Sequence, residues 1–173
     1  HQIVVDLAKY ATIPVINGLS DLLHPCQALS DVFTIQEKLK KLSDVTMAYI
    51  GDGNNVCHSL MFTAKKTGMH LKIATPKGYE PNAAIVKETK GSITLTRDPY
   101  EAVKDADVIY TDVWASMGQE AEAEKRKKDF AGFQINQQLA AKAKCDYLFM
   151  HCLPAHREEE VTGVIIDGKH SIV

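Results

Sequence analysis

Short apolar runs alternate with amphipathic segments along most of this chain. Five runs are predicted to form buried strands, at residues 46–50, 70–75, 92–96, 108–111 and 147–150, with 171–173 as a further candidate. Between them the hydrophobic positions recur with helical spacing, at about 56–68, 82–90, 98–105, 119–129 and 134–143. Strands that alternate with helices indicate right-handed crossovers. We therefore expect an α/β fold: a doubly wound, mainly parallel, Rossmann-like sheet with helices on both faces, in three layers.

The first part of the chain has a different pattern. Residues 3–10 favour a helix and residues 13–18 a strand and a turn, and a long amphipathic helix then runs to about Leu42. A single helix and strand cannot bury their own apolar faces. We therefore expect residues 1–31 to be the remnant of a preceding domain and residues 32–173 to form the α/β domain.

Composition narrows the class of ligand. Of the 173 residues, 45% are hydrophobic and 24% charged, as in soluble globular proteins. The net charge of −2 gives no electrostatic reason to expect nucleic acid or an anionic membrane as a partner, so a small molecule is expected. The four cysteines form no C-x-x-C pair, which favours free thiols in a reducing cytosol.

Polar loops follow the predicted strands, where open α/β sheets bind ligands. The loop 51–55, GDGNN, resembles the start of a dinucleotide-binding turn but lacks the third glycine. The next strand ends without the acidic residue that would bind a ribose, so a nicotinamide cofactor is excluded. One of Asn54 and Asn55 is expected to cap the following helix, and the other is free to bind a polar ligand.

The loop 111–118, TDVWASMG, places Asp112 beside apolar side chains. A carboxylate in such surroundings suits recognition of an amine, although an Asp here could also be a plain helix cap. The run 151–157, HCLPAHR, presents Cys152 after a strand, either as a buried thiol or as a group facing a reacting atom. A zinc site of His151, Cys152 and His156 matches no known spacing, so no metal is expected.

The run 24–31, HPCQALSD, begins the long amphipathic helix. His24 and Gln27 are three residues apart at the helix start and would point the same way, offering two donors to one carbonyl oxygen. Taken alone, the same run would be better explained by a hydrogen-bonded surface histidine and a helix-filling glutamine.

Together, and in this order, these four motifs resemble the ornithine carbamoyltransferase family, over essentially the whole chain. The resemblance implies carbamoyl transfer from carbamoyl phosphate to the δ-amine of L-ornithine, giving L-citrulline and phosphate without metal or organic cofactor. It also implies a homotrimer for the intact enzyme, located in the cytoplasm, or in the mitochondrial matrix if the source is eukaryotic.

The resemblance assigns roles residue by residue. The implied ornithine ligands are Asn55, Asp112, Ser116 and Met117, and the implied carbamoyl phosphate ligands are His24, Gln27, Cys152 and Leu153. Asp112 and Cys152 are expected to line the δ-amine, and His24 to stabilise charge on the carbonyl oxygen. Cys152 is not expected to be a covalent nucleophile. The loop 116–118 is expected to close over ornithine.

Two family features do not occur in the chain. These are the Ser-x-Arg-Thr phosphate loop and a late Asn-Arg pair before a closing C-terminal helix. We therefore expect residues 1–31 to belong to the carbamoyl-phosphate-binding domain and the chain to be inactive alone, because the phosphate lacks its guanidinium clamp. The alternative is a stand-alone ornithine-binding module without transferase activity.

Overall fold

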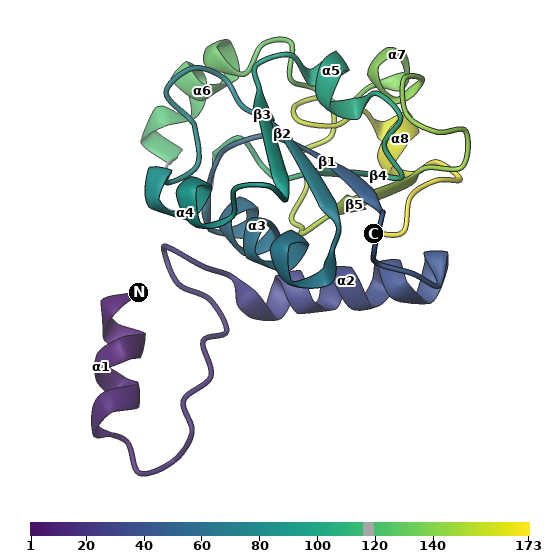
Figure 1. Cartoon of the computed structure of the whole chain (residues 1–173). Helices are drawn as coiled ribbons and strands as arrows, with labels where there is room; N and C mark the ends of the chain where they lie inside the picture. The colour runs from purple at the N-terminus through teal and green to yellow at the C-terminus, as the bar shows by residue number, and fades with distance from the viewer. Residues whose placement is uncertain (116–119) are drawn as a thin grey trace.

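A five-stranded parallel sheet forms the centre of the computed structural model, which describes residues 1–115 and 120–173 (Figure 1). The strands are β1 (Thr46–Ile50), β2 (His70–Ala74), β3 (Ile93–Thr96), β4 (Val108–Thr111) and β5 (Leu148–His151). Their order is β3-β2-β1-β4-β5, and all neighbouring pairs are parallel. This arrangement confirms the predicted doubly wound α/β class.

Helices cover both faces of this sheet. The helices of the described residues are α1 (Gln2–Tyr10), which lies away from the sheet, and α2 (Pro25–Leu39), α3 (Asn55–Thr67), α4 (Ala83–Glu88), α5 (Pro99–Val103), the 3₁₀ helix η1 (Glu120–Glu122), α6 (Ala123–Asp129), α7 (Gln137–Ala140) and α8 (Gly163–Ile166). Met47 and Tyr49 of β1 point to the core shared with α2, α3 and α4, whereas Ala48 and Ile50 point to the core shared with α5, α7 and α8. Strands β1 and β4 are mostly apolar because both of their faces are buried, whereas β2 carries Lys72 and the edge strand β3 is partly exposed.

Local chemistry sets the limits of the two helices nearest the site. Pro25 occupies the first turn of α2, where its missing N–H would have no helical partner. The side chain of Asn54 caps α3 by accepting from the backbone N–H groups of Val56 and Cys57. Helix α3 ends at Gly68, whose φ of +78° is a left-handed conformation that glycine adopts readily.

Several predicted elements differ from the structure. Residues 13–18 form no strand, and 171–173 contribute only a single bridge between Ser171 and Phe149. The helix predicted at 134–143 is reduced to α7, and α8 was not predicted. Apolar and β-branched residues favour a strand only where a neighbouring strand pairs with them. The predicted domain boundary after residue 31 lies inside α2 and stays a prediction.

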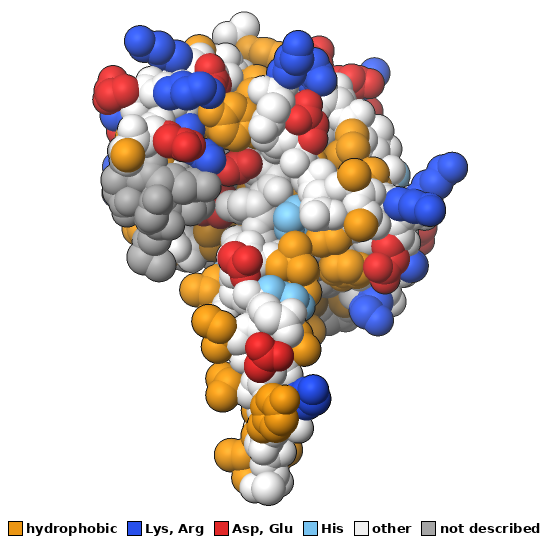
Figure 2. All heavy atoms as spheres, turned by 90° about the vertical axis from the view of Figure 1, so that its left-hand side faces the viewer, with side chains coloured by type: hydrophobic (Ala, Val, Ile, Leu, Met, Phe, Trp, Pro, Cys, Tyr) orange, Lys and Arg blue, Asp and Glu red, His pale blue; other side chains and the backbone are white. Residues whose placement is uncertain are grey.

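Helix α1 and the segment after it project from the body of the molecule (Figures 1 and 2). Their exposed large apolar side chains are Ile3, Val5, Leu7, Tyr10, Ile13, Ile16 and Leu19. None of the residues of α1 is buried. Across the described part of the chain, no helix is both long enough and apolar enough to cross a membrane.

Candidate active site

Three neighbouring strands deliver the candidate residues to one edge of the sheet. In the register, Ile50 at the end of β1 pairs with Thr111 at the end of β4, which pairs with His151 at the end of β5. The chain continues from these ends into the 51–55 loop, Asp112 and Cys152. The motifs are therefore neighbours because parallel strands end at the same edge.

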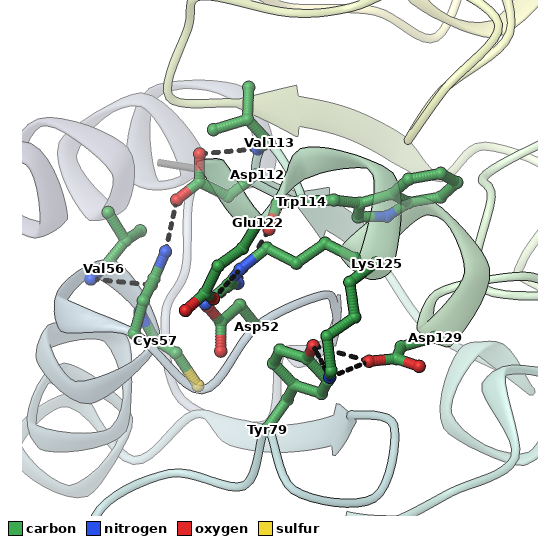
Figure 3. A network of polar contacts seen from close by, with 12 residues as sticks. Asp52, Val56, Cys57, Tyr79, Asp112, Val113, Trp114, Glu122, Lys125 and Asp129 are labelled. Carbon is green, nitrogen blue, oxygen red and sulfur yellow. Dashed lines mark hydrogen bonds and ion pairs between the residues drawn. The ribbon is translucent and has the colours of Figure 1, made fainter. Parts of the chain in front are cut away.

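Asp112 lies at the centre of this edge and is only 6% exposed. Its Oδ1 accepts from the Cys152 thiol at 2.9 Å and from the backbone N–H of Val113 at 2.7 Å. Its Oδ2 accepts from Nδ2 of Asn54 at 2.7 Å (Figure 3). Both carboxylate oxygens are thus held by donors from three different segments, which fixes the orientation of the group.

The Cys152 thiol is a donor in this site. Burial raises its pKa well above the usual range for a thiol, and the negative charge of Asp112 and the hydrogen bond to it raise the pKa further. The sulfur is therefore protonated at neutral pH. A protonated thiol is a poor nucleophile, in keeping with the expectation that Cys152 forms no covalent intermediate.

The two asparagines of the 51–55 loop have different roles. Asn54 caps α3 through Oδ1 and holds Asp112 through Nδ2. Asn55 donates from Nδ2 to the backbone oxygen of Ser20 at 2.7 Å and lines the pocket described below. The contact between Asn54 and Asp112 was not predicted, although a capping asparagine keeps two spare N–H donors that could have suggested it.

His24 is the N-cap residue of α2. Its backbone N–H donates to Oγ of Ser59 at 2.8 Å, and Ser59 in turn donates to the backbone oxygen of Asn55 at 2.9 Å. Nδ1 of His24 is buried and has no hydrogen-bond partner among the described residues. The start of α2 is thereby tied to α3, and His24 borders the pocket described below.

Gln27 does not point into the same pocket as His24, although the sequence predicts that it would. Its Nε2 donates to Oδ1 of Asp31 at 2.9 Å, and Gln27 is not among the residues that line the pocket containing His24. The predicted pair of donors converging on one carbonyl oxygen is therefore not formed. The implied contact of Gln27 with the carbamoyl group stays a prediction.

Leu153 lies in a sharp turn after β5. Its φ is +57°, a left-handed conformation rare for a branched residue, and the bond to Pro154 is cis. Its backbone N–H donates to Nδ1 of His151 at 2.8 Å. The buried Nε2 of His151 lies 3.3 Å from Oε1 of Glu160. His151 therefore supports the turn, while Leu153 and Cys152 border the pocket.

These groups surround one open cavity, which we call the site pocket, with a volume of about 490 Å³. Its lining residues are Leu19, Ser20, Asp21, His24, Asn55, Val56, Asp112, Val113, Ala115, Cys152, Leu153, Pro154 and His156. It brings together His24, Asn55, Asp112, Cys152 and Leu153 of the predicted site. Ser116 and Met117, and the predicted closure of the loop 116–118, lie outside the described residues.

A buried ion pair supports the site from the other side of the 51–55 loop (Figure 3). Nη1 of Arg126 donates to Oδ2 of Asp52 at 2.7 Å and to the backbone oxygen of Trp114 at 2.8 Å. Burial raises the pKa of Asp52, and the hydrogen bond and charge of Arg126 oppose that rise. Arg126 was not predicted, because it lies in a run of basic residues that is typical of a solvated helix.

The residues considered for zinc do not form one cluster. Cys152 contacts Asp112, and His151 contacts Glu160. Within the described ranges, the one group of potential metal ligands is His156, Glu159 and Glu160. Glu159 already forms an ion pair with Lys127 at 2.8 Å, so these three residues are accounted for by protein contacts.

Comparisons with known proteins point to one family. The family model described as aspartate/ornithine carbamoyltransferase, Asp/Orn binding domain, matches residues 43–173, and the model for the carbamoyl-P binding domain of the same family matches residues 1–37. Curated ornithine carbamoyltransferases from Pyrococcus horikoshii and Anoxybacillus flavithermus are each 59% identical over 100% of this chain. The chain spans only 57% of the length of each of them.

Solved structures give the same result. The ornithine carbamoyltransferase from Pyrococcus furiosus is 59% identical with a TM-score of 0.93, and covers 99% of this chain and 57% of its own. The enzyme from Thermus thermophilus is 42% identical with a TM-score of 0.90, over 99% of this chain and 56% of its own. The fold is therefore shared with ornithine carbamoyltransferases of which this chain spans little more than half the length.

Proposed function

The chain belongs to the aspartate/ornithine carbamoyltransferase family, and on that premise we propose that it supplies the ornithine-binding part of an ornithine carbamoyltransferase. The proposed reaction transfers the carbamoyl group of carbamoyl phosphate to the δ-amine of L-ornithine, giving L-citrulline and phosphate. The amine lone pair attacks the carbonyl carbon, the bond from that carbon to the phosphate oxygen breaks, and its electron pair leaves with phosphate. The nitrogen then loses one proton, which the departing phosphate takes up.

The fixed carboxylate of Asp112 is the observation that carries this proposal. An attacking amine must be neutral and oriented, and a buried acceptor of set geometry can orient it through its N–H groups. Asp112 is held by Asn54 and Cys152 and borders the site pocket. The δ-amine would therefore be directed by Asp112, beside a thiol that remains protonated.

His24 is placed to act on the other reactant. Negative charge grows on the carbonyl oxygen in the tetrahedral transition state, and a hydrogen-bond donor there lowers its energy. His24 lines the same pocket as Asp112. We assign the carbonyl oxygen to His24 and the α-amino and α-carboxylate groups of ornithine to the region of Asn55.

The remaining assignments follow from the length of the relatives. We propose that residues 1–31 belong to the carbamoyl-phosphate-binding domain, supported by the match of that family model to residues 1–37. The phosphate clamp would come from the part of the relatives' length that this chain does not span. A homotrimer that works in the cytoplasm, or in the mitochondrial matrix of a eukaryote, is the assembly and location that we propose for the full-length protein.

A hybrid enzyme tests the reaction. In it, this chain replaces the matching 57% of the Pyrococcus horikoshii ornithine carbamoyltransferase. We expect the hybrid to form citrulline from ornithine and carbamoyl phosphate, and Asp112→Asn to lower kcat/KM for ornithine by about 100-fold, the range of a lost charged contact of about 3 kcal/mol. The exposed Asp146, replaced by Asn, is the matched control and should leave the rate unchanged.

Two outcomes would contradict the proposal. Equal kcat/KM for the Asp112→Asn and Asp146→Asn hybrids would remove Asp112 from the amine role. A folded hybrid that forms no citrulline, together with calorimetric binding of ornithine by the chain itself, would favour the stand-alone ornithine-binding module.

A further inference from the structure

A buried carboxylate lies next to the site pocket without an assigned role. Asp31 on α2 is 4% exposed, one turn after Gln27. Its Oδ1 accepts from Nε2 of Gln27 at 2.9 Å, and its buried Oδ2 faces the Tyr110 hydroxyl, whose hydrogen bond lowers the pKa of Asp31. No cation of the described residues lies within ion-pair distance of it. A buried carboxylate without a cation is destabilising and calls for an explanation.

Groups from three segments of the chain face Asp31. The groups that face it are Gln27 on its own helix, Tyr110 on β4 and Cys152 after β5. Its negative charge contributes to the raised pKa of both the Tyr110 hydroxyl and the Cys152 thiol. Burial raises the pKa of Asp31 itself to about 6, so the group is mainly ionised at neutral pH. The carboxylate therefore remains an acceptor while the enzyme works.

An ionised carboxylate decides which way the Gln27 amide is turned. Such a group accepts hydrogen bonds and donates none, so the amide nitrogen of Gln27 must face it. The amide oxygen, Oε1, is then the end left for other contacts. A carbamoyl group carries two N–H donors and needs an acceptor of this kind, whereas a flipped amide would offer further donors to the same nitrogen.

We propose that Asp31 is a positioning residue: it holds Nε2 of Gln27, so that Oε1 is presented as the acceptor for the carbamoyl nitrogen. This assignment deepens the proposed function and rests on it and on the implied contact of Gln27 with the carbamoyl group. It explains why a carboxylate is buried at a position where an apolar residue would cost less. It also predicts that Asp31 acts on ligands that carry an amide nitrogen and not on phosphate itself.

The test measures binding and needs no turnover. Calorimetry on the hybrid enzyme compares phosphonoacetamide, which carries an amide nitrogen, with inorganic phosphate, which does not. We expect Asp31→Ala to raise the Kd of phosphonoacetamide by about 10-fold and to leave the Kd of phosphate unchanged. Asp31→Asn keeps an oxygen that accepts from Gln27 and should raise the first Kd by only about 3-fold.

A double-mutant cycle separates positioning from a general structural role. In a Gln27→Ala background, Asp31→Ala should change the Kd of phosphonoacetamide by less than about 2-fold, because the residue through which it acts is gone. Thr34→Ala, on the same helix and bonded only to the backbone of Ser30, is the control and should behave as wild type. If Asp31→Ala does not fold, the cycle is run with Asp31→Asn, whose 3-fold effect should vanish without Gln27.

Three results would overturn the proposal. These are equal weakening of both ligands, additive effects of the Gln27 and Asp31 changes, or unchanged phosphonoacetamide binding in both Asp31 variants. A hybrid that binds phosphonoacetamide with the expected Asp31 dependence but forms no citrulline would contradict the proposed reaction and leave the positioning role in place.

Discussion

Replacing Asp31 with asparagine removes a titratable carboxyl from the interior and should change how stability depends on pH. Burial raises the pKa of Asp31 from 3.8 to about 6, so the folded state holds the proton more tightly than the unfolded state does. Stability from this group is therefore highest when it is protonated, falls as pH rises from 3.8 to about 6, and stays low above that.

The size of the effect follows from the shift. A difference of about two pKa units at about 1.4 kcal/mol each corresponds to about 3 kcal/mol. Asparagine has nearly the same shape and no titration. The free energy of unfolding of Asp31→Asn, compared with that of wild type, should therefore rise by up to about 3 kcal/mol between about pH 4 and about pH 7, and then level off.

Urea unfolding at half-unit steps of pH measures this difference. Asp167→Asn is a control of opposite sign, because the hydrogen bond and charge of Arg157 lower the pKa of the exposed Asp167. That contribution is present above the unfolded pKa and is lost as pH falls, so Asp167→Asn should be the less stable protein at neutral pH only. If the difference in free energy of unfolding between wild type and Asp31→Asn did not change with pH, the raised pKa of a buried Asp31 would be refuted.

Three further predictions concern packing, capping and thiol chemistry. Gly53→Ala should lower the free energy of unfolding in urea by more than about 3 kcal/mol, because the alanine Cβ would lie 2.3 Å from the backbone nitrogen of Pro81. A decrease below about 1 kcal/mol would contradict this close approach. Asn54→Ala should lower the free energy of unfolding by about 1–2 kcal/mol through loss of the α3 cap, and no change would exclude the cap. In native protein at pH 8, iodoacetamide should label the exposed Cys26 and leave Cys152 unlabelled, because burial and the charge of Asp112 keep the Cys152 thiol protonated. Mass spectrometry measures the labelling, and equal labelling of the two cysteines would contradict the raised pKa of Cys152.

The central strands were predictable from sequence because they are buried on both faces. β1 and β4 form at the predicted residues, since continuous apolar runs between turn signals leave little choice of register. The segment 13–18 has similar residues and forms no strand, because pairing depends on neighbours that a local pattern does not contain. Short α8 begins with glycine and was missed for lack of helical periodicity.

The sequence predicted which residues lie in the site better than it predicted the contacts that they form. Asp112, Cys152 and His24 meet because strand ends and a helix start bring motifs together. The orientation of Gln27 toward Asp31, and the pairing of Arg126 with Asp52, depend on side-chain directions across segments far apart in sequence. Nothing in the local pattern distinguishes Arg126 from the lysines beside it.

The capping position of α3 limits which sequences can keep this site. Helix N-caps usually exchange among Asn, Asp, Ser and Thr with little loss of stability. At position 54, aspartate would retain the cap but set a second carboxylate against Asp112, and serine would retain it but is too short to replace the amide donor. Only asparagine both caps the helix and donates to the carboxylate. A position at which helix stability alone would tolerate several residue types is therefore restricted to one amino acid.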